Sequence, residues 1–250
     1  MTTIREIYEA VDVAAPFAMA MDRDNVGILV GSPDRAVHRV MLCLDITPEI
    51  VAEAAGKQVD LIVSHHPVIF QPMTSLFGES VPYLLAAAGI GALCCHTNLD
   101  FSDSIGVNIA LGKVIGLSQV EPAGNGLFMG KLPAALDPLA FAKQVKTALH
   151  SPAVFVHPGE GSVRKVCVIG GAAGSFLAEV SESDADALVV GELKHHERLL
   201  VADFRMTVIE AGHYETEQCF TDCLMPYLQK KFPEIGWIRS KAQHPPMTVV

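Results

Sequence analysis

Short apolar runs alternate with helical stretches along most of this chain, and that alternation restricts the fold more than any other feature. Residues 38–46 and 60–66 are apolar runs of strand length, and residues 47–58 between them carry helix signals. Thr47 is the predicted N-cap of that helix, with Pro48 at its first position. Strands separated by helices are typical of α/β proteins. We therefore predict an α/β fold.

The same pattern begins again after residues 121–126, which are rich in glycine and proline. The stretches 58–67 and 184–196 resemble each other, because each runs from an acidic residue through an apolar strand to a polar turn. We predict two similar α/β lobes with mixed sheets, divided into residues 1–123 and 124–250. The expected strands are 38–46, 60–66, 90–100, 163–171, 185–192, 206–213 and 235–240, and the expected helices 3–14, 47–58, 81–88, 105–115, 136–149, 193–204 and 214–232.

Charge and hydropathy exclude several classes of partner. The chain has 18 basic and 28 acidic residues, a formal charge of -10, and no run of lysine or arginine, so we expect no direct binding to nucleic acid. Residues 80–99 carry no charge, but Pro82 and Gly89 interrupt them, and we interpret them as a buried helix and strand rather than a membrane span. The first residues lack the features of a signal peptide, which favours a cytoplasmic protein.

Half of the residues are hydrophobic and only 18% are charged. Apolar surface in that proportion favours burial between subunits, so we expect a homo-oligomer. The six cysteines form no CxxC pair, and we expect reduced thiols. Cys94 and Cys95 lie in an apolar run and are expected to be buried packing residues.

Side chains that can bind metals follow four of the predicted strands. His65 and His66 end one apolar run, and Pro67 behind them favours a bend that would let both rings share a target. His96 and Asp100 end the next run. Because ligands of open α/β sheets bind outside the carboxyl ends of the strands, these groups are expected to converge. The other two strand ends supply Glu192, followed by His195 and His196, and His213 with Glu217.

His213 and Glu217 are four residues apart, so on a helix that begins after Gly212 they share one face. Mixed imidazole and carboxylate ligands suit zinc, iron, manganese, cobalt or nickel better than calcium or magnesium. Two carboxylates among five ligands exceed the needs of one closed tetrahedral site, and a bridged dinuclear centre uses them all. The alternative is that the histidines are structural, each satisfied by a backbone carbonyl.

Seven segments in a fixed order resemble one known family. They are DNVGILVG (24–31), DLIVSHHPVIF (60–70), HTNLD (96–100), GVNIALGKVIGL (106–117), VIGGAAGS (168–175), VVGELKHHE (189–197) and EAGHYETE (210–217). Together they resemble the dinuclear-metal family labelled GTP cyclohydrolase I type 2, or Nif-three-like, in its short form without an inserted domain.

The resemblance implies two divalent metal ions per chain, held by His65, His66, Asp100, His213 and Glu217, with Glu217 as the bridge. It implies that His96 orients Asp100 or a water, and that the metal site lies in the cleft between two lobes. It further implies a toroidal homohexamer and a small-molecule substrate such as a purine nucleotide.

Three further motifs have competing interpretations. His195 and His196 lie about 100° apart on a predicted helix, so at most one can face a site. VIGGAAGS could cradle a phosphate, but without a GK[ST] sequence a tight strand-to-helix turn is favoured. A zinc cluster of His213, Cys219 and Cys223 is disfavoured, because the spacing matches no common finger.

The chemistry that these residues favour is hydrolysis, because paired metals activate water and stabilise an oxyanion. Glu192, after a predicted strand, is the candidate to transfer a proton. A purine nucleotide, in a ring opening of the GTP cyclohydrolase kind, or a phosphoester is the expected substrate. The alternative is a protein without catalysis, which binds or delivers metal or serves as a scaffold.

Overall fold

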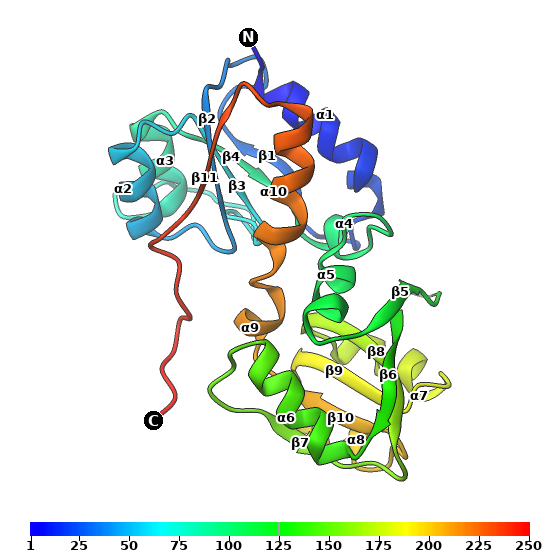
Figure 1. The fold of residues 1–250 in the computed structure, drawn as a ribbon. Helices are drawn as coiled ribbons and strands as arrows, with labels where there is room; N and C mark the ends of the chain where they lie inside the picture. Colours follow the sequence, from blue (N-terminus) through cyan, green and yellow to red (C-terminus); the bar gives the residue numbers. More distant parts are fainter. Residues whose placement is uncertain (125) are drawn as a thin grey trace. The chain divides into compact units, whose positions relative to one another are not determined.

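The computed structural model describes residues 1–124 and 126–250, and their contacts form two compact units (Figure 1). Unit 1 comprises Met1–Gly106 with Phe220–His244, and unit 2 comprises Val107–Cys219 with Pro245–Val250. These limits differ from the predicted boundary between residues 123 and 124. The glycine-rich stretch at that boundary includes Asn125, which lies outside the described residues. The difference arises because the chain returns to unit 1 at Phe220, so that unit 1 is discontinuous in sequence.

Unit 1 is built on a five-stranded mixed sheet with the strand order β1-β4-β3-β2-β11. Four of the strands are parallel, and β1 pairs antiparallel with β4. The last strand of the sequence therefore lies beside β2, which no local pattern indicates. The bounds are β1 Gly27–Val30, β2 Arg39–Cys43, β3 Leu61–Ser64, β4 Gly91–Cys94 and β11 Gly236–Arg239.

Helices cover both faces of this sheet (Figure 1). On one face α2 and α3 pack together over the core residues Met41, Ile62 and Leu85, and on the other α1 contacts α10. Thr47 caps α2 as predicted, and Thr3 forms a capping box with Glu6 at α1. The helices are α1 Ile4–Ala14, α2 Pro48–Gly56, α3 Val81–Ala88, α4 Thr97–Asp100 and α10 Phe220–Lys231.

Unit 2 is built on a six-stranded mixed sheet with the order β5-β6-β8-β9-β10-β7, in which β8, β9 and β10 are parallel. Helices α7 and α8 supply side chains to one core, and α5 and α9 contact the sheet at β8. The strands are β5 Ser118–Pro122, β6 Phe128–Leu136, β7 Phe155–His157, β8 Val163–Ala172, β9 Ala187–Glu192 and β10 Thr207–Glu210, and the helices α5 Val107–Val114, α6 Pro138–Ala148, α7 Leu177–Ser181, α8 His195–Val201 and α9 His213–Glu217.

The predicted α/β class with two mixed sheets is confirmed, but several elements differ. The run 90–100 is not one strand, because the strand ends at Cys94 and Thr97–Asp100 is helical. Asp24 accepts hydrogen bonds from Thr97 N, at 3.3 Å, and Thr97 Oγ1, at 2.5 Å, which stabilises that helical turn. The predicted helix 214–232 is two helices, α9 and α10, and the break between them coincides with the change of unit at Phe220.

The strands missing from the prediction are β1, β5, β6 and β7, all of which pair antiparallel. Three of them lack a continuous apolar run, since β5 is mostly exposed, Pro133 interrupts β6 and β7 is only Phe155–His157, whereas β1 is a short apolar run outside the predicted strands. In the described part of the chain, no helix is both long and apolar enough to cross a bilayer.

Candidate metal centre

His65 and His66 follow β3, where the regular strand stops. The backbone N–H groups of both continue the sheet contacts, donating to Cys43 O at 3.3 Å and Leu44 O at 3.0 Å, while the chain bends. The Ser64 hydroxyl donates to His66 O at 2.8 Å across the bend. As a result the two rings lie 5.1 Å apart, centroid to centroid, instead of on opposite faces of a strand. The bend predicted before Pro67 is present.

His96 follows the neighbouring strand β4 and lies beside both of these rings. Its centroid is 5.2 Å from that of His65 and 5.4 Å from that of His66. One ligand atom from each of the three histidines lies within 4.8 Å of the others, a spacing that could hold a metal ion. Asp100, one turn further on α4, places Oδ1 3.6 Å from His65 Nε2. Unit 1 thus brings together all four of its predicted groups.

The Nδ1 atom of each of these histidines meets an oxygen acceptor. His65 Nδ1 is 2.9 Å from Cys95 O, His66 Nδ1 2.7 Å from Asp45 Oδ1, and His96 Nδ1 2.8 Å from Asp24 Oδ1. A neutral imidazole that donates through Nδ1 carries its lone pair on Nε2, the tautomer inferred for all three rings. Metal-binding histidines are oriented in this way, by a carboxylate or carbonyl on the other nitrogen.

The Asp24 carboxylate is partly buried and accepts several hydrogen bonds. Burial by itself would raise its pKa, but hydrogen bonds from His96 and Thr97 lower the pKa to about 2. The carboxylate therefore stays ionised over the physiological range and holds its partner His96 in one orientation.

In unit 2, Gly212 leads from β10 into the short helix α9, with φ at 99°. On this helix His213 Nε2 lies 3.0 Å from Glu217 Oε2, which confirms that the two side chains share a face. His213 Nδ1 lies 3.1 Å from Glu192 Oε1 at the end of β9. Glu192 is therefore a partner of His213, in the same relation that Asp24 has to His96.

The glycine-rich segment 168–175 packs against Glu217. Gly171 has φ at 63°, and a Cβ there would overlap the Glu217 carboxylate. Two backbone N–H groups of the segment already have protein partners, since Gly170 N donates to Asn108 Oδ1 at 2.8 Å and Gly171 N to Thr216 Oγ1 at 3.1 Å. This arrangement fits the tight turn, because a phosphate cradle needs such groups available for the ligand.

The two units repeat the same construction. Asp60 before β3 accepts from His38 N at 2.7 Å and Arg39 N at 3.0 Å, and Asp186 before β9 accepts from Arg164 N at 2.9 Å and Lys165 N at 2.7 Å. In each unit the next parallel strand leads to a histidine followed four residues later by a carboxylate. The resemblance between segments 58–67 and 184–196 therefore extends to HxxxD and HxxxE.

The remaining candidates lie elsewhere. His195 and His196 are both exposed on α8. Cys94 and Cys95 are buried, and burial raises the pKa of both thiols, as expected for packing residues. Asp24 and Asp45 were missed by sequence reasoning. Asp45 follows strand β2, so the rule that located the other groups at strand ends could have found it, whereas no local pattern marks Asp24.

Comparison with known proteins decides the family. Residues 2–246 match the model of the Duf34/NIF3 (NGG1p interacting factor 3) family. The chain belongs to the Duf34/NIF3 family. A relative from a Nostoc species, called GTP cyclohydrolase 1 type 2 homolog, is 31% identical over 82% of this chain and 82% of its own length. One of the same name from Streptomyces coelicolor is 30% identical over 95% of this chain and 89% of its own length.

Solved structures share the fold of this chain. A hypothetical protein from Staphylococcus aureus superimposes with a TM-score of 0.90 at 25% identity, over 99% of both chains. The resemblance read from the seven motifs is confirmed, and with it the two-sheet α/β fold.

Proposed function

We propose that this Duf34/NIF3 protein is a metal-dependent hydrolase with a dinuclear centre. The proposed ligands are His65, His66, Asp100, His213 and Glu217. The observation that carries the proposal is the pairing of Nδ1 with an oxygen acceptor in every ligand histidine. Structural histidines have no need to present Nε2 consistently, whereas metal ligands do.

The donor set fits first-row divalent metals. Three imidazoles and two carboxylates favour zinc, iron, manganese, cobalt or nickel, and a carboxylate such as that of Glu217 can bridge two ions. His96 lies within the histidine group of unit 1, and its Nδ1 faces Asp24 rather than Asp100. We assign it to the wall beside the ions, where it orients a water or substrate.

Paired metal ions lower the pKa of water and act as Lewis acids toward a developing oxyanion. The side chains of this chain supply the other functions. Asp45 and Asp24 hold His66 and His96 in orientation. Glu192, whose side chain is 58% exposed, holds His213 and is open enough to accept a proton from a water and return it to a leaving group.

For the substrate we propose a purine nucleotide, opened at its imidazole ring, since the relatives are called GTP cyclohydrolase 1 type 2 homologs. A phosphoester fits the same chemistry, because paired metals stabilise the attacking and leaving oxygens of a phosphoryl displacement. The fold alone does not choose between these substrates.

The test combines metal analysis with turnover. Purified protein is measured for bound metal per chain and screened against nucleoside triphosphates and phosphoesters. Glu192→Gln retains an oxygen that can accept from His213 but cannot take up a proton, so turnover should fall at least ~10-fold while metal content stays constant. Glu215→Gln is the matched control, because Glu215 lies on α9, the short helix that carries His213. This variant should retain both the metal content and the turnover of the wild type.

Two results would contradict the proposal. Purified protein that holds no stoichiometric metal would indicate that the histidines have a structural role. Protein that holds exchangeable metal and turns over no member of the panel would favour metal binding or delivery without catalysis.

A further inference from the structure

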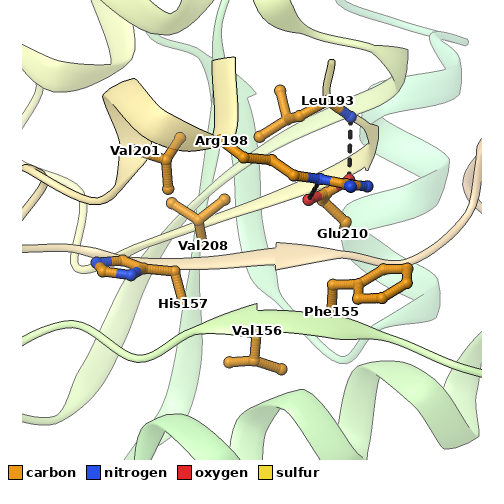
Figure 2. A pocket seen from close by; sticks show the side chains of 8 residues that line it. All are labelled: Phe155, Val156, His157, Leu193, Arg198, Val201, Val208 and Glu210. Atoms are coloured by element: carbon orange, nitrogen blue, oxygen red, sulfur yellow. Dashed lines mark hydrogen bonds and ion pairs between the residues drawn. The ribbon is translucent and has the colours of Figure 1, made fainter. Parts of the chain in front are cut away.

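A cavity lies in unit 2, lined by residues of α8, β10 and β7 and by Leu193 (Figure 2). Its volume is about 210 Å³. The side chains of Val201 and Val208 form an apolar middle, with His157 at one end and the Arg198–Glu210 pair at the other, whereas the Val156 side chain points to the opposite side of β7. Apolar walls with a few polar groups at defined places are typical of small-molecule sites.

The acidic member of the pair has its acceptors occupied. Glu210 is buried, and its carboxylate accepts from Arg198 Nε at 2.7 Å, Arg198 Nη2 at 2.8 Å and Leu193 N at 3.1 Å. The Glu210 side chain is only 9% exposed. An entering ligand therefore meets little of this carboxylate.

The basic member is accessible by contrast. The Arg198 side chain is 46% exposed, and among the described residues no acceptor pairs with its Nη1. The Phe155 ring lies 5.1 Å from the guanidinium carbon and covers one face of it, which fixes the plane of the fork. The cavity thus presents the N–H donors of an oriented guanidinium beside an apolar space. This arrangement is suited to the recognition of a carboxylate.

We propose that this cavity binds a small monocarboxylate with a short branched aliphatic body. The carboxylate meets the outer N–H groups of Arg198, and the aliphatic part fills the space lined by Val201 and Val208. A volume of 210 Å³ equals the liquid volume of about seven waters, which is below the range of drug-sized sites and excludes a nucleotide. The site is separate from the proposed metal centre in its ligand class and does not depend on it.

The contacts of the Glu210 carboxylate link this cavity to the backbone next to Glu192, and Glu192 contacts His213. Glu210 ends β10 and accepts from Leu193 N, and the preceding residue Glu192 carries the carboxylate that meets His213 Nδ1. A ligand that binds Arg198 and shifts its guanidinium should therefore also shift Glu210 and the backbone of Leu193, next to Glu192. A change in the His213 environment is the expected secondary readout.

The experiment is a methyl NMR titration of the full chain labelled at valine and leucine, with 4-methylpentanoate as the probe. We expect saturable methyl shifts confined to Val201, Val208 and Leu193, with a dissociation constant on the order of 1 mM for so small a ligand. The neutral amide of the same acid should bind at least ~10-fold more weakly, because it lacks the charge that pairs with Arg198. A shift of the His213 ring signal should follow the same curve.

Three variants separate the site from a general effect. Val201→Phe fills the cavity and should abolish the saturable shifts, and Leu199→Phe, on the exposed side of α8, should leave them unchanged. Arg198→Lys removes the planar fork and should weaken binding at least ~10-fold. Equal affinity for acid and amide, saturation that survives Val201→Phe, or the absence of shifts in the wild-type protein would each overturn the proposal.

Discussion

At the scale of single residues, the orientation of each imidazole is fixed by the acceptor that its Nδ1 atom contacts. The Nδ1 partners are a backbone carbonyl for His65 and the Asp45 carboxylate for His66, so the two adjacent rings are held by different elements. The two ring planes differ by 44°. Neighbours in sequence are thus directed along different lines, which suits ligands of two separate ions better than chelation of one.

We therefore predict that His65→Ala and His66→Ala each empty a different metal position. Each variant should lose about one of the two proposed equivalents, because an ion that loses one imidazole binds at least ~10-fold more weakly. Metal content is measured by elemental analysis after gel filtration, and anomalous scattering from crystals identifies which position is empty.

His38→Ala is the control, since His38 is an exposed histidine of the same unit. It should retain full metal content. If both ligand variants also retain full content and fold normally by circular dichroism, neither histidine is a ligand.

At the scale of elements, one partly buried carboxylate ties the segment after β11 to helix α2. Glu53 on α2 accepts from Lys57 Nζ at 2.5 Å, from the Ser240 hydroxyl at 2.6 Å, and from Ala242 N at 3.1 Å. It also accepts from Lys241 N at 3.0 Å. Burial by itself would raise the Glu53 pKa, but these hydrogen bonds lower it to about 2. The contact holds the segment after β11 against the helix.

Glu53→Gln should lower the free energy of unfolding by about 1–3 kcal/mol at neutral pH, the range for hydrogen bonds to a charged group. Because the folded-state pKa lies below the ordinary value of 4.5, the stabilisation is fully present above that pH. It is lost as the pH falls toward about 2.

Urea unfolding of both proteins at several pH values between about 7 and 3 measures this difference, which should narrow as the solution becomes more acidic. Glu9→Gln, an exposed glutamate on α1, should unfold like the wild type at every pH. A difference that stays constant across this range would show that the Glu53 charge is not the stabilising feature.

At the scale of the whole molecule, the segment that follows His66 exposes several large apolar side chains. Phe70 is 56% exposed and Phe77 71% exposed, with Met73 and Leu76 between them. Clustered apolar surface of this kind marks a contact with another protein. We infer that this segment contacts another subunit in the proposed toroidal homohexamer.

Light scattering after gel filtration should accordingly give a mass six times that of the chain. Phe77→Ser should shift the population toward smaller species, because it removes apolar area from the contact. Leu139→Ser changes an exposed apolar residue in unit 2 and should leave the mass unchanged. A wild-type protein with the mass of a single chain would contradict the homohexamer.

Much of the fold could be predicted from the sequence, and the misses have a common cause. The capped helices α1 and α2 and the apolar parallel strands carry their signals locally, through Thr3, Thr47 and continuous hydrophobic runs. The antiparallel strands β5 and β7 carry little such signal, since they are short and at least partly exposed at the sheet margins. Pairing with a distant partner makes them strands.

The sequence by itself determined the α/β class, the membership of the Duf34/NIF3 family and the identity of the candidate ligands. Each of these depends on residue type and local spacing, such as HxxxD at 96–100 and HxxxE at 213–217. Only the tertiary structure decided that Asp24 is the partner of His96 and Asp45 that of His66. These carboxylates lie 72 and 21 residues from their histidines in sequence, and contacts over such distances form only when strands assemble into a sheet.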